Sequence, residues 1–363
     1  MTGSNFISDL RSNVRAELPF HLFVLLYGCA AMILALCLGR PEKMLALMYA
    51  RRFIELTLLA LCFFVAWQGL ASIRASSPLQ AFRRRLAAYF TPIFASRLLL
   101  FANISVFYGL FTSFKRMLSD LRDFNYDPQL AEFDQLLHGS DPWLMFSYSE
   151  PLTRAFQFFY LHGWLVCMVF FSLYVIVAQP PHLMRRFVTT FYLTWALLGN
   201  VVAAIFMSAG PVYYQAVADS SRFEPLLDRF EFSYGMLSSS VNVQDRLWQD
   251  YMLDLGLLGS GISAFPSLHV AMATLWTITA WSINKVLFAC MATVLILVQL
   301  GSVYLGWHYA IDGYFSLVAV ILLWALVPHL SNLPAKITRA YAWVINRTNR
   351  KRVAPVHVFP VEH

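Results

Sequence analysis

Charged residues are scarce in this sequence. Only 13% of the 363 residues are Asp, Glu, Lys or Arg, while 59% are hydrophobic and 16% are aromatic. A soluble domain of this length has too little interior to hide so much apolar side chain. The composition therefore excludes an ordinary cytosolic enzyme, a disordered chain and a nucleic-acid-binding module. The formal net charge of +7 is explained by basic loops of a membrane protein rather than by a nucleic-acid partner.

Cysteine is also rare. The five cysteines lie inside apolar runs, and none forms a Cys-x-x-Cys pair. This pattern gives no disulfide framework and no metal signature, and we expect neither a metal nor a cofactor. The first apolar run follows a polar segment that ends at Glu17, and it is too long for a cleaved signal peptide. We interpret it as the first membrane span.

Long apolar runs dominate the rest of the chain. A helix needs about 20 mostly apolar residues to cross a bilayer, and its backbone must satisfy its own hydrogen bonds there. We therefore predict an all-α polytopic membrane bundle of about eight transmembrane helices, at residues 19–39, 53–72, 93–114, 157–178, 187–208, 264–283, 286–304 and 308–328.

The distribution of Lys and Arg favours a cytoplasmic N-terminus. With this orientation the turn at 40–52 places four cations outside, which is the one misfit. Either the first two spans form a re-entrant pair or this turn meets anionic lipid. The long outside segments 115–156 and 209–263 mix apolar and acidic residues, and we predict that they form helices lying on the membrane surface.

We divide the chain into three parts. Residues 1–92 form an N-terminal extension of two spans, residues 93–330 form a six-span catalytic core, and residues 331–363 form a basic cytoplasmic tail. The surface helices at 115–156 and 209–263 either cap the bundle or also wall a site through which lipid enters.

Three ionisable residues fall at membrane depth, where charge is costly and usually functional. Two crossings separate His269 from His308, so both imidazoles are expected at the outer face. Asp312 follows His308 by four residues and shares its helix face, so the carboxylate can accept the imidazole N–H. Such a pair makes a histidine a nucleophile or a base. Pro266 and Ser267 mark a helix start beside His269, with free backbone N–H groups suited to an anion.

These motifs resemble a known family. Pro266-Ser-Leu-His269 and His308-Tyr-Ala-Ile-Asp312 are similar to the second and third motifs of the type 2 phosphatidic acid phosphatase superfamily. The Phe-Pro-Ser-Leu-His variant, together with Ser208-Ala-Gly-Pro-Val-Tyr-Tyr214, is more similar to the inositol phosphorylceramide synthase (aureobasidin-resistance) branch. Asp127-Pro, Leu136-Leu-His138-Gly and Asp141-Pro-Trp143 resemble bacterial members of that branch.

The resemblance implies a six-helix phosphatase-type core and metal-independent phosphoryl transfer. It makes His308 the nucleophile that forms a phosphohistidine, Asp312 the residue that orients it, and His269 the acid that protonates the leaving oxygen. The phosphatases also carry Lys-x6-Arg-Pro and an Arg before the nucleophile, and both are missing here. Those cations hold a phosphomonoester of nearly two charges, so their loss favours a phosphodiester donor. Cations from the loops that can replace them are Lys115, Arg116 and Arg222.

The function that we expect is a membrane lipid phosphotransferase that moves a phospho-headgroup from a phospholipid donor to a lipid alcohol. The alternatives are a lipid phosphate or polyprenyl diphosphate phosphatase and, from another class, a non-catalytic lipid-binding or transport protein. We expect an integral protein of a bacterial inner membrane with its site on the periplasmic face; the sequence does not indicate an oligomeric state. The residues expected to bind substrate are Ser267, Pro266, Gly210, Tyr213, Tyr214, Tyr309 and His162.

Overall fold

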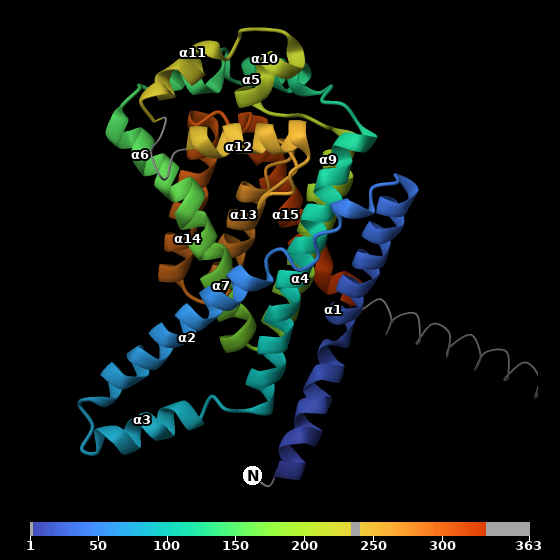
Figure 1. The fold of residues 1–363 in the computed structure, drawn as a ribbon. Helices are drawn as coiled ribbons and strands as arrows, with labels where there is room; N and C mark the ends of the chain where they lie inside the picture. The colour runs from blue at the N-terminus through green and yellow to red at the C-terminus, as the bar shows by residue number, and fades with distance from the viewer. Residues whose placement is uncertain (1–2, 234–239, 332–363) are drawn as a thin grey trace, which may run out of the picture.

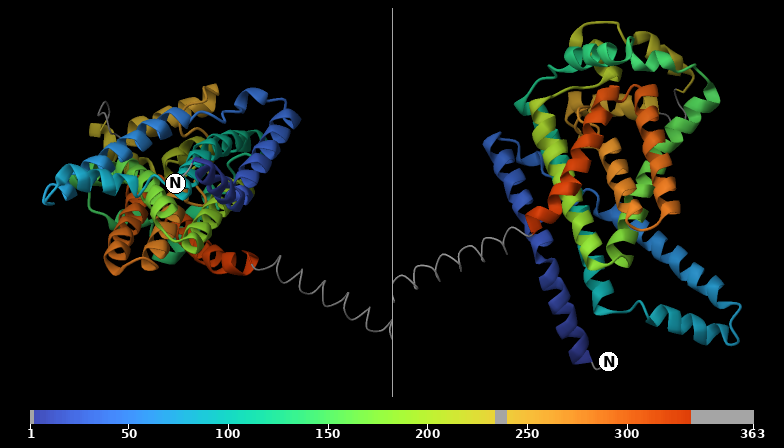
Figure 2. Two further views of the ribbon diagram at one scale, coloured as in Figure 1. Left: turned by 90° about the horizontal axis from the view of Figure 1, so that it is seen from below. Right: turned by 180° about the vertical axis from the view of Figure 1, so that it is seen from behind.

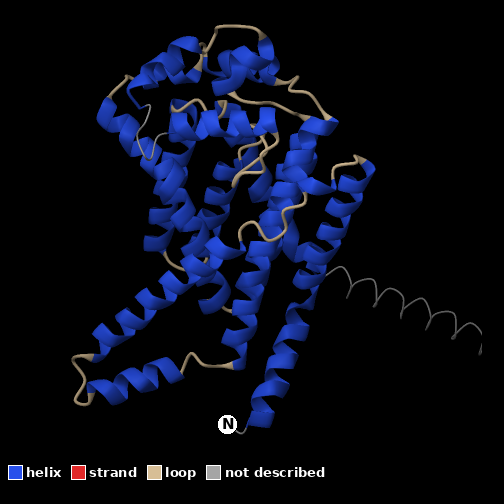
Figure 3. Cartoon of the chain, in the orientation of Figure 1, coloured by secondary structure: helices blue, strands red, loops and turns tan. Residues whose placement is uncertain are grey.

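The computed structural model of the chain describes residues 3–233 and 240–331. Within these ranges the chain forms helices and connecting loops and no strand (Figure 3). The predicted tail at 331–363 lies almost entirely outside the described residues.

Seven stretches of helix are long and apolar enough to cross a membrane. Two of them contain a π-helical segment: η3 (Phe159–Gly163) and η4 (Thr194–Val202). The result confirms an all-α polytopic membrane bundle. The seven stretches are α1 (Gly3–Cys37), α2 (Ala50–Ser72), α4 (Pro92–Leu121), α6–η3–α7 (Glu150–Ala178), α8–η4–α9 (Pro181–Ile205), α14 (Lys285–Tyr304) and α15 (Ala310–Ser331).

The eighth predicted span, 264–283, is shorter than expected. Residues 264–267 are loop, and helix α13 (Leu268–Trp281) has 14 residues, which makes it about 21 Å long. It packs against α14, α15 and α8, and most of its side chains are buried. Because α13 is enclosed by other helices, it does not need the length of a lipid-facing span.

A layer of short helices covers one end of the bundle (Figures 1 and 2). The sequence predicted surface helices in both segments that build it, although α4 takes residues up to Leu121 and α6 begins at Glu150. We call this layer the cap. It consists of α5 (Asp127–His138), η2 (Pro142–Met145), η5 (Pro211–Tyr213), α10 (Tyr214–Ala218), α11 (Glu224–Leu227), η6 (Asp228–Ser233) and α12 (Ser240–Leu253).

The N-terminal helices lie on the outside of the bundle. Helix α1 packs along α4, while α2 and α3 (Pro78–Ala87) extend away from the cap (Figures 1 and 2). No residue of α3 is buried. Helices α2 and α3 form an arm beside the core, and none of the three N-terminal helices contributes a residue to the histidine pair described below.

The four cations of the turn between α1 and α2 all lie near carboxylates. Lys43 lies in η1 (Pro41–Lys43), and its ammonium is 2.7 Å from Asp120 Oδ2. Arg40 lies within 3.7 Å of Asp120 and Asp254. The remaining two cations, Arg51 and Arg52, both pair with Glu55. Each of the four cations therefore has a carboxylate within 4 Å.

Candidate active site

His308 lies in the loop that joins α14 to α15, under the cap. Its Nδ1 is 3.1 Å from Asp312 Oδ2, in the predicted i, i+4 arrangement. The backbone N–H of Tyr309 donates to the same oxygen at 3.1 Å. Asp312 is fully buried, and its carboxylate accepts a hydrogen bond from the Nδ1–H of His308. The pair therefore favours the tautomer with the proton on Nδ1, which leaves the Nε2 lone pair free for attack.

Burial also keeps His308 uncharged. The imidazole is almost wholly enclosed, and this loss of solvation lowers its pKa to about 3, with a further contribution from the positive charge of Lys115. A histidine with this pKa is neutral at physiological pH. The side chain is therefore held in its nucleophilic form.

His269 lies in the first turn of α13, and its ring centroid is 6.3 Å from that of His308. The helix begins at Leu268, two residues after the start that Pro266 indicated, and Ser267 is its N-cap: the Ser267 hydroxyl accepts from the Val270 N–H. The Ser267 N–H donates to the Asp312 carbonyl oxygen at 3.2 Å. This bond ties the start of α13 to α15, and so brings the two histidines together as predicted.

Two aromatic side chains hold the His269 ring. Tyr160 stacks on it with a centroid distance of 4.4 Å and an interplanar angle of 18°, and Trp164 lies at 4.3 Å. The indole N–H of Trp164 donates to the His269 carbonyl oxygen at 3.1 Å. Tyr160 belongs to the π-helical segment η3, a distortion that often occurs at functional sites.

Lys115, near the end of α4, supplies a cation to this group. Its charge acts on both His269 and His308, and its side chain lies against Gly261 of the loop that leads to α13. Within the described part of the chain it forms no ion pair with a carboxylate. The other two cations expected to replace the missing clamp do form ion pairs: Arg116 with Asp254, and Arg222 with Asp141.

The Asp127 carboxylate holds the loop at Ala209 and Gly210 in place. It accepts from the N–H groups of Ala209 and Gly210, at 2.8 and 2.7 Å, and from the Tyr309 hydroxyl at 2.9 Å. Burial raises the pKa of Asp127, and these hydrogen bonds oppose the rise. Gly210 has φ +97°, and a Cβ there would lie 2.7 Å from the Trp307 carbonyl oxygen. Only glycine fits this close approach.

Asp134 is a positioning residue that the sequence did not reveal. It accepts from the N–H groups of Ala310 and Ile311, at 2.6 and 2.9 Å. These N–H groups lie in the first turn of α15, where the helix itself offers them no acceptor. Asp134 follows Asp127 by seven residues on the amphipathic helix α5, so both carboxylates face the bundle. That spacing is the signal that identifies it.

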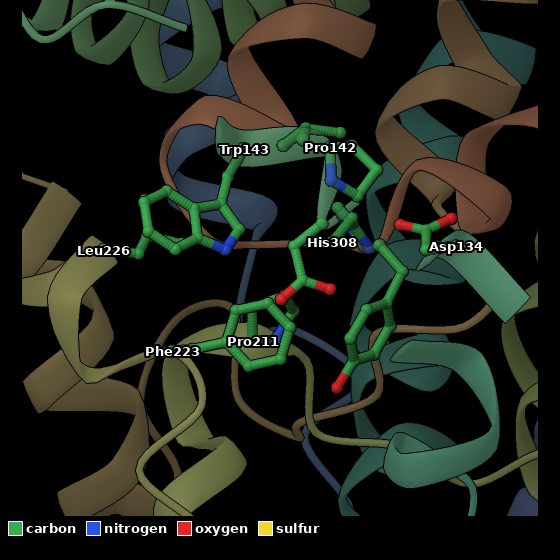
Figure 4. A pocket seen from close by; sticks show the side chains of 10 residues that line it. Asp134, Pro142, Trp143, Pro211, Phe223, Leu226 and His308 are labelled. Atoms are coloured by element: carbon green, nitrogen blue, oxygen red, sulfur yellow. The ribbon is translucent and has the colours of Figure 1, made fainter. Parts of the chain in front are cut away.

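A small apolar pocket borders His308 beneath the cap. Its volume is about 10 Å³, room for about one water molecule. In Figure 4 Trp143, Leu226 and Phe223 lie on one side and Asp134 on the other, with His308 between them. The cap segments that bring these side chains together therefore shield His308 from solvent.

The remaining predicted binding residues have other partners. The Tyr213 hydroxyl donates to the Gln244 carbonyl oxygen at 2.8 Å, and the Tyr214 hydroxyl lies against the Arg222 guanidinium. Tyr309 is bound to Asp127, as described above. His162 is exposed and stacks on Phe158 at 5.7 Å, so its neighbours Tyr160 and Trp164 make the contacts that were expected of it. Pro266 precedes the cap residue of α13 and is buried.

Comparison with known proteins agrees with this geometry. Residues 128–327 match the model of a family described as the PAP2 superfamily. No curated protein and no solved structure matches the chain. The matched residues make up more than half of the chain and include both histidines and Asp312. The chain belongs to the PAP2 superfamily, whose members generally act as phosphatases or phosphotransferases on lipids.

Proposed function

We propose that this protein is a lipid phosphotransferase, similar to inositol phosphorylceramide synthase, that moves a phospho-headgroup from a phospholipid to a lipid alcohol. The observation that carries the proposal is the pairing of His308 with Asp312, near His269 and near Lys115, a cation to which the described residues offer no carboxylate partner. The reaction uses these side chains and no metal.

The transfer proceeds in two displacements. His308 Nε2 attacks phosphorus, the bond from phosphorus to the oxygen of the donor's lipid alcohol breaks, and His269, which enters this step protonated beside the anionic donor, gives its proton to that oxygen. The acceptor's hydroxyl oxygen then attacks the phosphohistidine while His269 takes its proton, and the bond from phosphorus to Nε2 breaks. The enzyme ends in its starting state.

The charge of the site supports a phosphodiester donor. Lys115 is one cation, and a phosphodiester carries one negative charge. A phosphomonoester carries nearly two, and the guanidinium groups of Arg116 and Arg222 are bound to Asp254 and Asp141. A lysine holds a phosphate oxygen as a point charge.

The cap supports a lipid alcohol as the acceptor rather than water. The walls of the pocket beside His308 are mostly apolar, with Trp143, Phe223 and Leu226 among them. An enclosed apolar site limits hydrolysis of a reactive intermediate. The phosphohistidine on His308 therefore survives until an alcohol from the membrane reaches it.

A product assay on the purified protein in detergent tests the proposal. Labelled phosphatidylinositol is supplied with ceramide or diacylglycerol, and a labelled lipid monophosphate or diphosphate is supplied in parallel without acceptor. We expect label on the new lipid, with turnover unchanged by EDTA. Inorganic phosphate released only from the monoester or diphosphate would make the protein a phosphatase instead.

The His308→Ala variant is the matched control. It should lose at least about 10³-fold in turnover, because it removes the nucleophile, while its melting temperature stays close to that of the wild-type protein. Full transfer by this variant would contradict the phosphohistidine mechanism. No product from either protein would favour a lipid-binding or transport role.

A further inference from the structure

Tyr160 is buried at the centre of the active site, and its hydroxyl has no hydrogen-bond partner among the described residues. More than nine in ten buried polar groups in proteins do have a partner, and an exception calls for an explanation. Tyr160 is not part of the two motifs that contain His269 and His308. Its role must therefore be derived from its surroundings.

The Tyr160 ring is held in place on several sides. It is nearly parallel to the rings of His269 and Trp307, at interplanar angles of 18° to each and centroid distances of 4.4 and 5.9 Å. Trp307 directly precedes His308 in the chain. The phenol is thus fixed against His269 and Trp307 by stacking, and its hydroxyl is not needed for this.

The groups around the hydroxyl are those that handle the phosphoryl group. The Asp312 carboxylate lies close enough to act on it electrostatically, and Lys115 acts on both histidines from α4. One oxygen of Asp312, Oδ1, is likewise without a partner within the described ranges. An ammonium and a buried O–H donor without a partner therefore lie in the neighbourhood of the two histidines.

We propose that the Tyr160 hydroxyl donates a hydrogen bond to a non-bridging oxygen of the phosphoryl group during transfer. This inference rests on the proposed function, and it makes Tyr160 a catalytic residue alongside Lys115. The hydroxyl keeps its proton throughout, so no further covalent step is required. A donor that is fixed before the substrate arrives stabilises the charge that develops on the transferring group.

Tyr160 lies in η3, and Trp164 follows it by four residues, a spacing that puts both side chains on one face of the span. Tyr160 and Trp164 point to His269, whereas His162 between them is exposed.

The test uses Tyr160→Phe, which preserves the stacked ring and removes only the oxygen. The matched control is Tyr192→Phe. Tyr192 is equally buried, and its hydroxyl also has no partner within the described part of the chain, but it packs on Phe23 and Phe107 rather than on a histidine. Both variants should keep the melting temperature of the wild-type protein.

The probe is orthovanadate, which adopts the geometry of a transferring phosphoryl group. Its affinity is measured by thermal stabilisation of the purified protein, which requires no turnover, and as an inhibition constant if transfer is observed. We expect Tyr160→Phe to bind vanadate about 10- to 100-fold more weakly and to lose a similar factor in kcat/KM. Tyr192→Phe should match the wild-type protein in both.

The outcomes separate this inference from the proposed function. Weakened vanadate binding in a protein that releases phosphate instead of transferring it would support Tyr160 and refute the transferase. Equal vanadate affinity in Tyr160→Phe and wild type would overturn the role of Tyr160 even if transfer is confirmed. A shifted acid limb of the pH profile with unchanged vanadate affinity would also overturn it, because the hydroxyl would then act on Asp312. Failure of the wild-type protein to bind vanadate would overturn both.

Discussion

Lys115 and Arg116 are neighbours on α4, yet they lie in opposite electrostatic surroundings. Arg116 belongs to a cluster of charges that joins the α1–α2 turn to the end of α4, where it pairs with Asp254, and Lys43 pairs with Asp120. Lys115 acts electrostatically on His269 and His308, and the described residues offer it no carboxylate. The cations in the charge cluster are paired with carboxylates of the protein. Lys115 has no such partner among the described residues, so its charge is available to an anionic ligand.

The strongest test of this difference is Lys115→Met. We expect turnover to fall about 100-fold or more, because one charge that stabilises the transferring phosphoryl group is lost. The melting temperature should hold or rise, since an uncompensated, partly buried cation costs stability. Both quantities are measured on the detergent-purified protein. A large loss of stability with normal kcat/KM would place Lys115 among the structural cations.

The reverse result is expected for Arg116→Met. The substitution leaves Asp254, whose side chain is 32% exposed, without its closest partner. The free energy of unfolding should fall by about 1–2 kcal/mol, less than for a fully buried pair because solvent and the neighbouring cations reach this carboxylate. Turnover at a temperature where both proteins are folded should remain within about threefold of wild type. A turnover loss as large as that of Lys115→Met would remove the distinction between the two neighbours.

The central part of this site was predictable from the sequence because it depends on membrane-crossing arithmetic. Two spans of known length separate His269 from His308, and one helical turn separates His308 from Asp312. These relations require no knowledge of side-chain packing. The same arithmetic predicted seven of the eight spans, and it overestimated the length of the eighth, 264–283, where the expected first turn at 264–267 is a loop.

The residues around this centre were not predictable in the same way. The sequence offered Lys115 as one of three candidate cations but did not separate it from Arg116 and Arg222, because that distinction depends on how α4 packs against a loop far along the chain. The sequence offered His162 of this span as a binding residue, whereas the structure turns its neighbour Tyr160 towards His269. Tertiary packing, rather than residue type or local spacing, decides these contacts.

The smallest expected effect comes from Arg40→Gln, in the same charge cluster as Arg116. The Arg40 side chain is 41% exposed, and its closest approaches to Asp120 and Asp254 are 3.6 and 3.7 Å, longer than a hydrogen bond. Solvent screening leaves such a pair below about 0.5 kcal/mol, so the free energy of unfolding and the turnover should both stay near wild type. Comparing unfolding at low and high salt gives the check, because whatever Arg40 contributes should vanish as salt screens it. A loss as large as that of Arg116→Met would show that the cluster acts as one unit, and that proximity to carboxylates, rather than burial, separates the structural cations from Lys115.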